Sequence, residues 1–249
     1  MAGHSKWASI KHKKKATDAK RGALFTKLTR AITVAARDGG DPEGNPSLAL
    51  AIQKAKDASM PKDNIERAIA KGTGADQDAD AFEAVTYEGY GPGGVAVLVE
   101  ALTDNRNRTS SDVRHAFTKS GGNLGEPGSV AWIFEKKGEI LVDGARYDED
   151  DLLAAIEAGA EDIAADGDVI EIVTGPSDLT AIRGALEEAG VELQSAELAM
   201  RPTNRIEIDE GQAGTLMKLL DTLDDNDDVQ AVHANFDAAA DVLERVAAG

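Results

Sequence analysis

The residues best suited to chemistry in this sequence are the cations near its N-terminus. Residues 1–30 hold nine lysines and arginines and one acid, a charge of +8 in a chain whose net charge is −18. The basic residues are Lys6, Lys11, Lys13, Lys14, Lys15, Lys20, Arg21, Lys27 and Arg30. The other 219 residues therefore sum to −26. A basic arm on an acidic body predicts that the N-terminus binds a polyanion.

The arm has the residue types that nucleic-acid contact needs. The run Lys11–Lys15 (KHKKK) neutralises phosphates and releases counterions, an interaction that depends on salt and not on base sequence. Trp7 is suited to stacking on an unpaired base, worth about 1–3 kcal/mol, and His4 and His12 add charge or a further ring. The alternatives are a solubilising tail, or Trp7 packed against the neighbouring helices. Nucleic acid is favoured, because such a cluster on a strongly acidic chain is rarely incidental.

A second basic group follows a buried strand, in the segment DNRNRT. It contains Arg106 and Arg108, with Arg114 further along the same expected helix. Helix N-termini favour anions, so this group fits a phosphate site. Pairing of Arg106 or Arg108 with Asp104 or Asp112 explains the same residues equally well, and the sequence does not decide between the two.

The sequence contains no complete catalytic or cofactor-binding motif. The segment 89–94 (GYGPGG) matches G-x-G-x-x-G, but its glycines precede a strand instead of following one, so a tight glycine loop is the better interpretation. The acidic run Asp224–Asp228 lacks the glycine and glutamate of a calcium loop and predicts a solvated turn. None of the four histidines has zinc-site spacing, and cysteine is absent. We therefore expect a protein that is not an enzyme, with no metal, cofactor or small-molecule substrate.

Hydrophobic periodicity predicts three short helices after the arm. Leu24, Leu28 and Ile32 form one apolar stripe, which Gly39-Gly40 ends. Asn45-Pro46 is a cap followed by proline at the first helical position, and a third helix begins near Pro61. Short connections make these helices a small bundle. With the arm, they form an expected domain over residues 1–78.

The pattern then changes to alternating strands and helices. A strand at 95–102, a helix from Thr109 and a strand at 130–134 predict one β-α-β unit. Residues 139–199 predict a complete β-α-β-β-α-β unit, the ferredoxin-like pattern. An extended segment, a helix and a strand at 229–235 complete the chain. Because neither outer half has enough sheet to cover its own helices, we expect residues 79–135 and 204–249 to form one discontinuous α+β domain, with strands near 97 and 232 in one sheet.

The expected fold class is thus α+β: an N-terminal three-helix domain and two ferredoxin-like domains, one of them, residues 136–203, inserted into the other. No signal peptide is apparent, and the longest apolar run is too short to span a bilayer. We expect a soluble cytoplasmic protein that does not enter membranes. Its acidic domains should face away from phosphate, which salt permits because it screens their repulsion beyond about 8–10 Å.

Several segments together resemble the YebC family, which includes the mitochondrial translational activator of cytochrome oxidase subunit I. They are GHSKW (3–7), IKHKK, DAKRGALFTKLTR, YEGYGPGGVAVLVEALTDNRNRT and VRHAFTKSGGNLGEPGSVAWIF. The resemblance covers nearly the whole chain and is looser across the acidic insert. It implies three domains, a cytosolic protein without enzymatic activity, and a functional surface at the GHSKW arm. Lys13-Lys14-Lys15 departs from the arginines and small residues of many members but keeps the charge.

The resemblance implies two kinds of function. Bacterial members are described as probable DNA-binding transcriptional regulators, and others as translation factors that act at the ribosome on difficult sequences such as proline runs. The sequence shows no helix-turn-helix and no helix rich in base-reading residues, which tells against DNA. A flexible arm with Trp7 and His12 suits single-stranded RNA. A third hypothesis is a protein-interaction module with an incidental tail.

Overall fold

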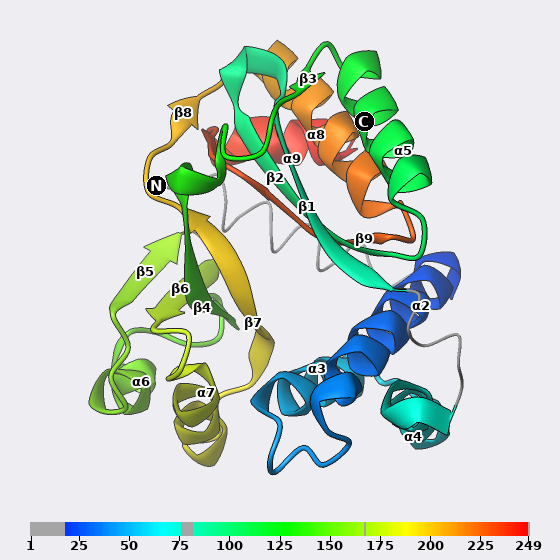
Figure 1. The fold of residues 1–249 in the computed structure, drawn as a ribbon. Helices are drawn as coiled ribbons and strands as arrows, with labels where there is room; N and C mark the ends of the chain where they lie inside the picture. The colour runs from blue at the N-terminus through cyan, green and yellow to red at the C-terminus, as the bar shows by residue number, and fades with distance from the viewer. Residues whose placement is uncertain (1–17, 76–81, 167, 249) are drawn as a thin grey trace.

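The computed structural model describes residues 18–75, 82–166 and 168–248, and its helices and strands form three packed groups (Figure 1). The first group is helical and consists of α2 (Asp18–Ala35), α3 (Pro46–Asp57) and α4 (Lys62–Ala70). Apolar side chains from all three meet in one core that includes Leu28, Ile32, Leu48, Ala55 and Ile65. The predicted three-helix bundle is confirmed.

Asn45 links the first two of these helices by hydrogen bonds. Its side-chain oxygen accepts a hydrogen bond from the Leu48 amide at 3.1 Å, which caps α3. Its amide nitrogen donates to the carbonyls of Ala35 and Gly39 at 2.7 and 2.9 Å. One buried asparagine therefore joins the end of α2 to the start of α3.

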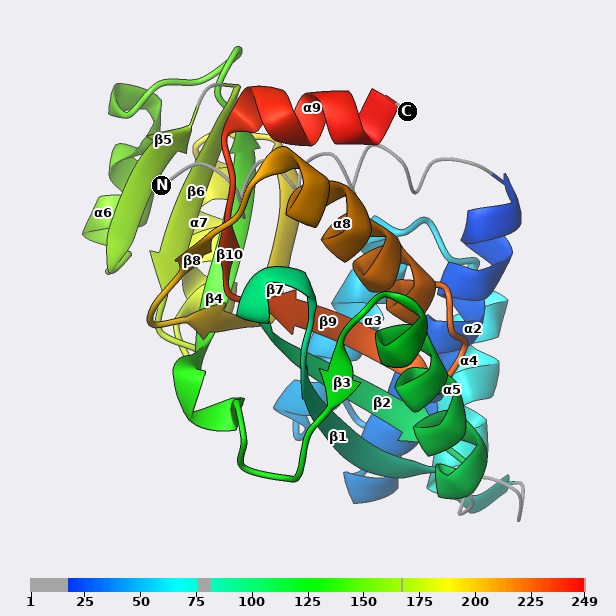
Figure 2. The same ribbon diagram turned by 90° about the horizontal axis from the view of Figure 1, so that it is seen from above.

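The second group is a four-stranded sheet with the order β3-β1-β2-β9. Its strands are β1 (Glu83–Tyr90), β2 (Ala96–Thr103), β3 (Asn123–Leu124) and β9 (Val229–Ala234). The helices α5 (Arg106–Lys119) and α8 (Glu210–Asp224) cover one face, where Val97 and Val99 pack with Phe117 and Leu216 (Figure 2). The antiparallel pairing of β9 with β2 places Val232 opposite Val99. The prediction that strands near 97 and 232 share a sheet is confirmed.

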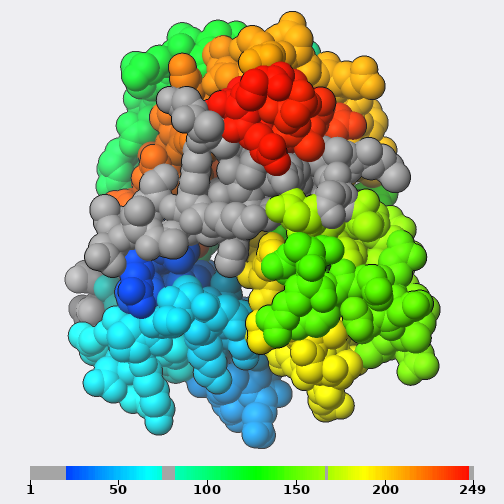
Figure 3. Space-filling model, turned by 180° about the vertical axis from the view of Figure 1, so that it is seen from behind, coloured from blue at the N-terminus to red at the C-terminus, as the bar shows by residue number. Residues whose placement is uncertain are grey.

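The C-terminal helix and a small ribbon complete this group. Helix α9 (Ala240–Ala248) packs beside α8, and β8 (Ile206–Glu207) pairs in parallel with β10 (Phe236–Asp237). Seen from behind, α9 lies in the upper part of the molecule, above the helical group and the third group (Figure 3).

The third group is an antiparallel sheet with the order β5-β6-β4-β7. Its strands are β4 (Phe134–Asp143), β5 (Asp162–Asp166), β6 (Val169–Thr174) and β7 (Leu193–Pro202). Alternate residues such as Ile140 and Ile172 pack against α6 (Leu153–Glu157) and α7 (Leu179–Glu188) on one face. This is the strand order of a ferredoxin-like unit, inserted between the segments of the other sheet. The predicted α+β fold class is confirmed.

The predicted strand at 130–134 is wrong. Residues Ala131–Ile133 form a 3₁₀ turn, and Phe134 begins β4, which belongs to the inserted sheet. The amides of Val130 and Ala131 donate to the Glu88 carboxylate at 2.7 and 2.8 Å, so these amides are not available to a strand ladder. The expected β-α-β unit is therefore replaced by a β1–β2 hairpin, followed by α5 and the short β3.

The glycine segment at 89–94 is the tight connection of that hairpin, as predicted. Gly93 and Gly94 have φ of 73° and 75°, values that residues other than glycine rarely adopt. The Gly91 amide donates to the Val95 carbonyl at 2.8 Å. Strand β1 itself was not expected, because only Gly89 and its neighbour Glu88 are fully buried along it. Across residues 18–75, 82–166 and 168–248, no helix is long and apolar enough to cross a membrane.

Candidate nucleic-acid interface

The predicted interface residues fall into two sets. His4, Lys6, Trp7, Lys11, His12, Lys13, Lys14 and Lys15 lie outside the described residues. Lys20, Arg21, Lys27 and Arg30 belong to α2, and Arg106, Arg108 and Arg114 to α5. Residues 1–17 directly precede α2 in the sequence, so the contacts of α2 are the described contacts nearest to the arm along the chain.

Two cations of α2 bind the acidic turn that follows α8. The Lys27 ammonium, largely buried, donates to the Asp224 carbonyl. The Arg30 guanidinium donates to the Asp227 carbonyl and to Asp228 Oδ1, the latter at 2.7 Å. These contacts join residues almost two hundred positions apart and hold α2 against the β9 end of the first sheet.

Asp228 also binds the second basic group. Arg108 Nη2 lies 2.8 Å from Asp228 Oδ2 and 2.8 Å from Asp104 Oδ1. The hydroxyls of Thr103 and Thr109 lie 3.3 and 2.7 Å from the same Asp228 oxygen. Burial by itself raises the pKa of the Asp228 carboxyl, but the hydrogen bonds from Arg108 and Thr109 outweigh it and lower the pKa below its ordinary value. Asp228 therefore stays ionised between two arginines.

The prediction of a solvated acidic turn at 224–228 is accordingly wrong for Asp228, which is only 3% exposed. The turn looked solvated because its partners, Arg30 and Arg108, are distant in sequence and come from different helices. Sequence reasoning missed Asp228 as a residue of this site. The only available signal was its possible charge pairing with basic residues of distant segments.

The remaining basic residues of α5 have different surroundings. Arg106 Nε lies 3.7 Å from Glu83 Oε1, and Arg114 is exposed. The Asn105 side chain caps α5 by accepting from the Arg108 amide at 3.1 Å. The sequence left open whether these arginines bind phosphate or pair with nearby acids. In the structure Arg108 pairs with Asp104, whereas Arg106 pairs with Glu83, which is distant in sequence.

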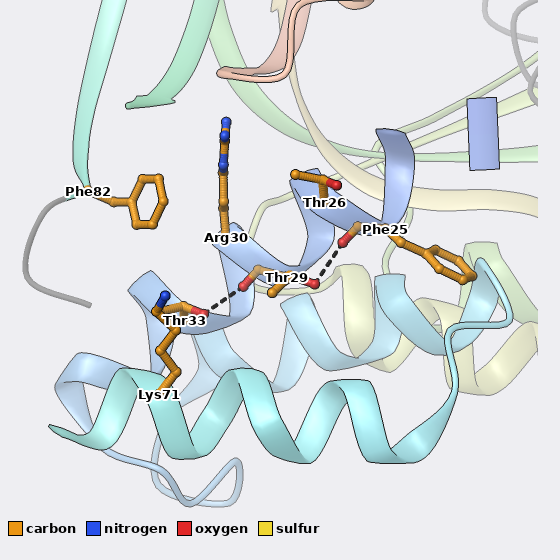
Figure 4. Close-up of a pocket in the computed structure, with 7 residues that line it drawn as sticks. All are labelled: Phe25, Thr26, Thr29, Arg30, Thr33, Lys71 and Phe82. Carbon is orange, nitrogen blue, oxygen red and sulfur yellow. Dashed lines mark hydrogen bonds between the residues drawn. The ribbon is translucent and has the colours of Figure 1, made fainter. Parts of the chain in front are cut away.

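A pocket of about 270 Å³ opens on α2, beside Arg30 (Figure 4). Its lining residues are Phe25, Thr26, Thr29, Arg30, Thr33, Lys71 and Phe82. The Arg30 guanidinium carbon lies 5.3 Å from the centre of the Phe82 ring, within cation–π range. The hydroxyls of Thr29 and Thr33 donate to carbonyls one turn back, each at 2.8 Å, and the Thr33 hydroxyl also lies 3.3 Å from the Ala68 carbonyl oxygen. The pocket combines aromatic surface, hydroxyl groups and two cations.

Within the described residues, neither metal ligation nor His233 contributes to this interface. Among the described residues, no group of three His, Cys, Asp or Glu side chains is placed to hold a metal ion. His233 is buried; its Nε2 lies 3.0 Å from Glu100 Oε2, and its Nδ1 lies 3.3 Å from the Met200 amide. The hydrogen bond from His233 lowers the pKa of Glu100. His233 of β9 thus links β2 and β7 within the fold.

Comparison with known proteins finds relatives that match almost the whole chain. A protein of Rubrobacter xylanophilus named "probable transcriptional regulatory protein" is 59% identical over 249 residues, 99% of this chain and 100% of the relative. A protein of Desulfotalea psychrophila with the same description is 55% identical over 250 residues, again 99% and 100%.

A crystal structure of a conserved hypothetical protein from Aquifex aeolicus superimposes with a TM-score of 0.80 at 50% identity, covering 89% of this chain and 92% of that one. Residues 5–75 match the TACO1/YebC N-terminal domain, and residues 82–236 match the TACO1/YebC second and third domain. The chain therefore belongs to the TACO1/YebC family.

Proposed function

We propose that this protein is a regulator of gene expression without enzymatic activity that binds DNA through its N-terminal basic arm in the cytoplasm. The observation that carries the proposal is the charge division of the chain, +8 in residues 1–30 against −26 in the rest. Repulsion by the acidic domains confines phosphate contact to the arm and its immediate surroundings. Relatives named as probable transcriptional regulators support a regulatory role.

The contacts of α2 divide the basic residues by task. Lys27, Arg30 and Arg108 are engaged with carbonyls and carboxylates of the chain itself, so we assign them to positioning α2. We assign phosphate contact to the arm lysines, together with Lys20, Arg21 and the exposed Arg114. The pocket beside Arg30 and Phe82 lies on the same helix and offers a neighbouring surface for a base or sugar.

The test is a fluorescence-anisotropy titration of labelled duplex DNA with the full chain at several salt concentrations. The full chain should bind with a strong salt dependence, with a slope of about −0.9 for each phosphate neutralised. Replacing Lys11, Lys13, Lys14 and Lys15 by Glu should weaken binding by more than about tenfold and flatten the slope.

The matched control replaces four exposed lysines of α3, α4, α5 and α8 by Glu: Lys56, Lys62, Lys119 and Lys218. It changes the net charge by the same amount outside the arm. If the control weakens binding as much as the arm variant does, the effect is one of net charge and the arm is not the contact.

RNA at the ribosome is the second candidate, and the start of α5 favours it. Asn105 already caps this helix and Arg108 is bound to two carboxylates, so the helix is not arranged to read base edges in a groove. The same titration with single-stranded RNA, together with co-migration with ribosomes on a sucrose gradient, decides between the two. Tighter binding to RNA than to duplex DNA, lost on deleting residues 1–17, would replace the DNA proposal by the translational one.

A further inference from the structure

The pocket on α2 is built from side chains of three parts of the chain. Phe25, Thr29 and Arg30 come from α2, Lys71 directly follows α4, and Phe82 directly precedes β1. Every lining residue belongs to the described ranges. The volume of about 270 Å³ lies just below the roughly 300 Å³ at which pockets for drug-sized ligands begin. The space therefore suits one planar ring system.

One wall of this pocket is a ring and a guanidinium that the protein already holds in place. Arg37 Nη1 donates a hydrogen bond to the Phe82 carbonyl at 2.7 Å, and the Phe82 ring centre lies 5.3 Å from the Arg30 guanidinium carbon. Arg30 is in turn paired with Asp228. Figure 4 shows Phe82 on one side of the Arg30 side chain and Thr26 on the other. A wall arranged before a ligand binds lowers the ordering cost of binding.

The chemistry of the lining selects for a flat group that carries negative charge nearby. Aromatic rings and guanidinium planes are the surfaces on which unpaired bases stack. Two of the lining residues, Arg30 and Lys71, are cations and none is acidic. A basic peptide is disfavoured by these charges, whereas a nucleotide supplies both a base for the wall and a phosphate for a cation.

The pocket also lies on the helix that directly follows the arm in sequence. Arg21 of the same helix has its guanidinium carbon 6.0 Å from the ring centre of Phe25, a pocket residue. The phosphates on the two sides of a bound base would therefore find cations near Phe25 and at Lys71. A strand held by the arm thus has a continuous path to the pocket along α2.

We propose that this pocket binds one unpaired nucleotide, with its base against the wall formed by Arg30 and Phe82. The proposal rests on the nucleic-acid binding proposed above and adds that the protein selects strands with an accessible base. A base inside a regular duplex is stacked and paired, so it does not reach such a pocket without being flipped out. Overhangs, bulges and single strands are the favoured ligands.

A double-mutant cycle between the protein and the oligonucleotide tests the pocket. One labelled DNA duplex ends in a short adenine overhang, and a second has abasic residues in the same overhang, so both carry the same phosphates. Removing the bases should weaken binding to the parent by about 5–150-fold. This loss should be at least about fivefold smaller in the Phe82→Leu variant. Equal losses in parent and variant would place the bases elsewhere, such as on Trp7, and overturn the proposal.

The cycle also separates base stacking from a purely structural role of Phe82. Leucine keeps an apolar side chain beside α2 but removes the ring. If Phe82 only joins β1 to α2, Phe82→Leu weakens binding of both duplexes by the same factor, which contradicts the pocket. Phe82→Tyr keeps the ring and should retain the base dependence of the parent.

The matched control is a similar arginine–ring pair in the inserted unit. The Arg146 guanidinium carbon lies 5.2 Å from the Tyr147 ring centre. Tyr147→Leu removes a ring from the same kind of pair and should leave the base dependence unchanged. Loss of the base dependence in this variant as well would show that the effect does not come from the pocket.

Free nucleotides separate this proposal from the proposed function. The labelled full chain is titrated with adenosine 5′-monophosphate or with ribose 5-phosphate, and the amide NMR signals of Thr26, Thr29 and Phe82 are followed. We expect these signals to shift with the first ligand alone. Equal shifts with both ligands would reveal an anion site and overturn the base pocket.

The two experiments together distinguish the two failures. A parent that binds adenosine 5′-monophosphate at these residues but no oligonucleotide would overturn the proposed function and leave the pocket standing. A parent that binds both duplexes equally well would overturn the pocket and leave the proposed function standing.

Discussion

Arg30 of α2 and Asp228 at the start of β9 form an ion pair across 198 residues of sequence, with Nη1 and Oδ1 2.7 Å apart. Asp228 is buried and also binds Arg108 of α5. The Asp228 carboxylate therefore attaches α2 to the first sheet, and α5 shares the same carboxylate.

Replacing Asp228 by Asn should destabilise the protein by about 2–4 kcal/mol, because it leaves Arg30 and Arg108 without their shared counter-charge. Urea unfolding followed by circular dichroism measures the loss. Asp225→Asn, an exposed change in the same turn, is the control and should stay within about 0.5 kcal/mol of the parent. Equal effects of the two changes would mean that the Asp228 contacts contribute nothing to stability.

Gly72, directly after α4, lies against α2 so closely that a side chain does not fit. A Cβ atom at this position would stand 2.3 Å from the Thr33 carbonyl oxygen and 2.6 Å from the Ala36 Cβ. Gly72→Ala should therefore push α2 away and cost about 1–3 kcal/mol. Gly22→Ala, within α2 with nothing in 4 Å, should instead stabilise by about 0.5–1 kcal/mol. Thermal unfolding of both variants checks the opposite signs.

Local signals in the sequence were enough for the helices and for the ferredoxin-like unit. Asn45-Pro46 and Gly39-Gly40 mark helix ends whose chemistry is confined to a few neighbouring residues. The short apolar runs at 139–142 and 169–173 form strand segments that are buried throughout. The sharing of a sheet by segments near 97 and 232 followed from a packing argument: half a unit cannot cover its own helices.

What the sequence did not yield depends on contacts between distant segments. VAWIF has the composition of a strand, yet the Glu88 carboxylate, over forty residues earlier, takes the amides that a strand would use. Asp228 lies in an acidic run typical of a solvated turn, yet it is buried and paired with Arg30 and Arg108. No local sequence pattern indicates these distant partners.

Glu88 should stabilise the protein only while it is ionised. Its carboxylate accepts hydrogen bonds from the amides of Gly128, Val130 and Ala131 at 2.6–2.8 Å. Burial raises the pKa of Glu88, but these three bonds outweigh it and lower the pKa below the ordinary 4.5. The stabilisation is therefore fully present above about pH 4.5 and is lost as pH falls through the lowered folded-state pKa.

Glu88→Gln should accordingly cost about 1–3 kcal/mol at pH 7 and much less near pH 3. Urea unfolding at a series of pH values gives the difference between variant and parent. Glu126→Gln, exposed in the same loop, should show no such convergence. A Glu88→Gln penalty that is constant from pH 7 to pH 3 would contradict the role of the ionised carboxylate.

Glu139 should show the opposite pH dependence. Burial and the charges of Glu171 and Glu197 raise its pKa to about 8, with Arg201 and Arg205 acting in the other direction. A folded-state pKa above the unfolded value means that the folded protein binds more protons. The contribution of Glu139 to stability is then fully present below about pH 4.5 and is lost as pH rises through about 8.

Glu139→Gln removes the titration without changing the shape of the side chain. Relative to the parent, the variant should therefore become more stable by on the order of 3 kcal/mol as pH rises from 4.5 to 8. Urea unfolding in about 0.5 M salt, which screens distant charges, isolates the response of the carboxyl group itself. The exposed Glu149→Gln change should leave the pH profile unaltered. Parallel profiles for Glu139→Gln and its parent would mean that Glu139 titrates normally.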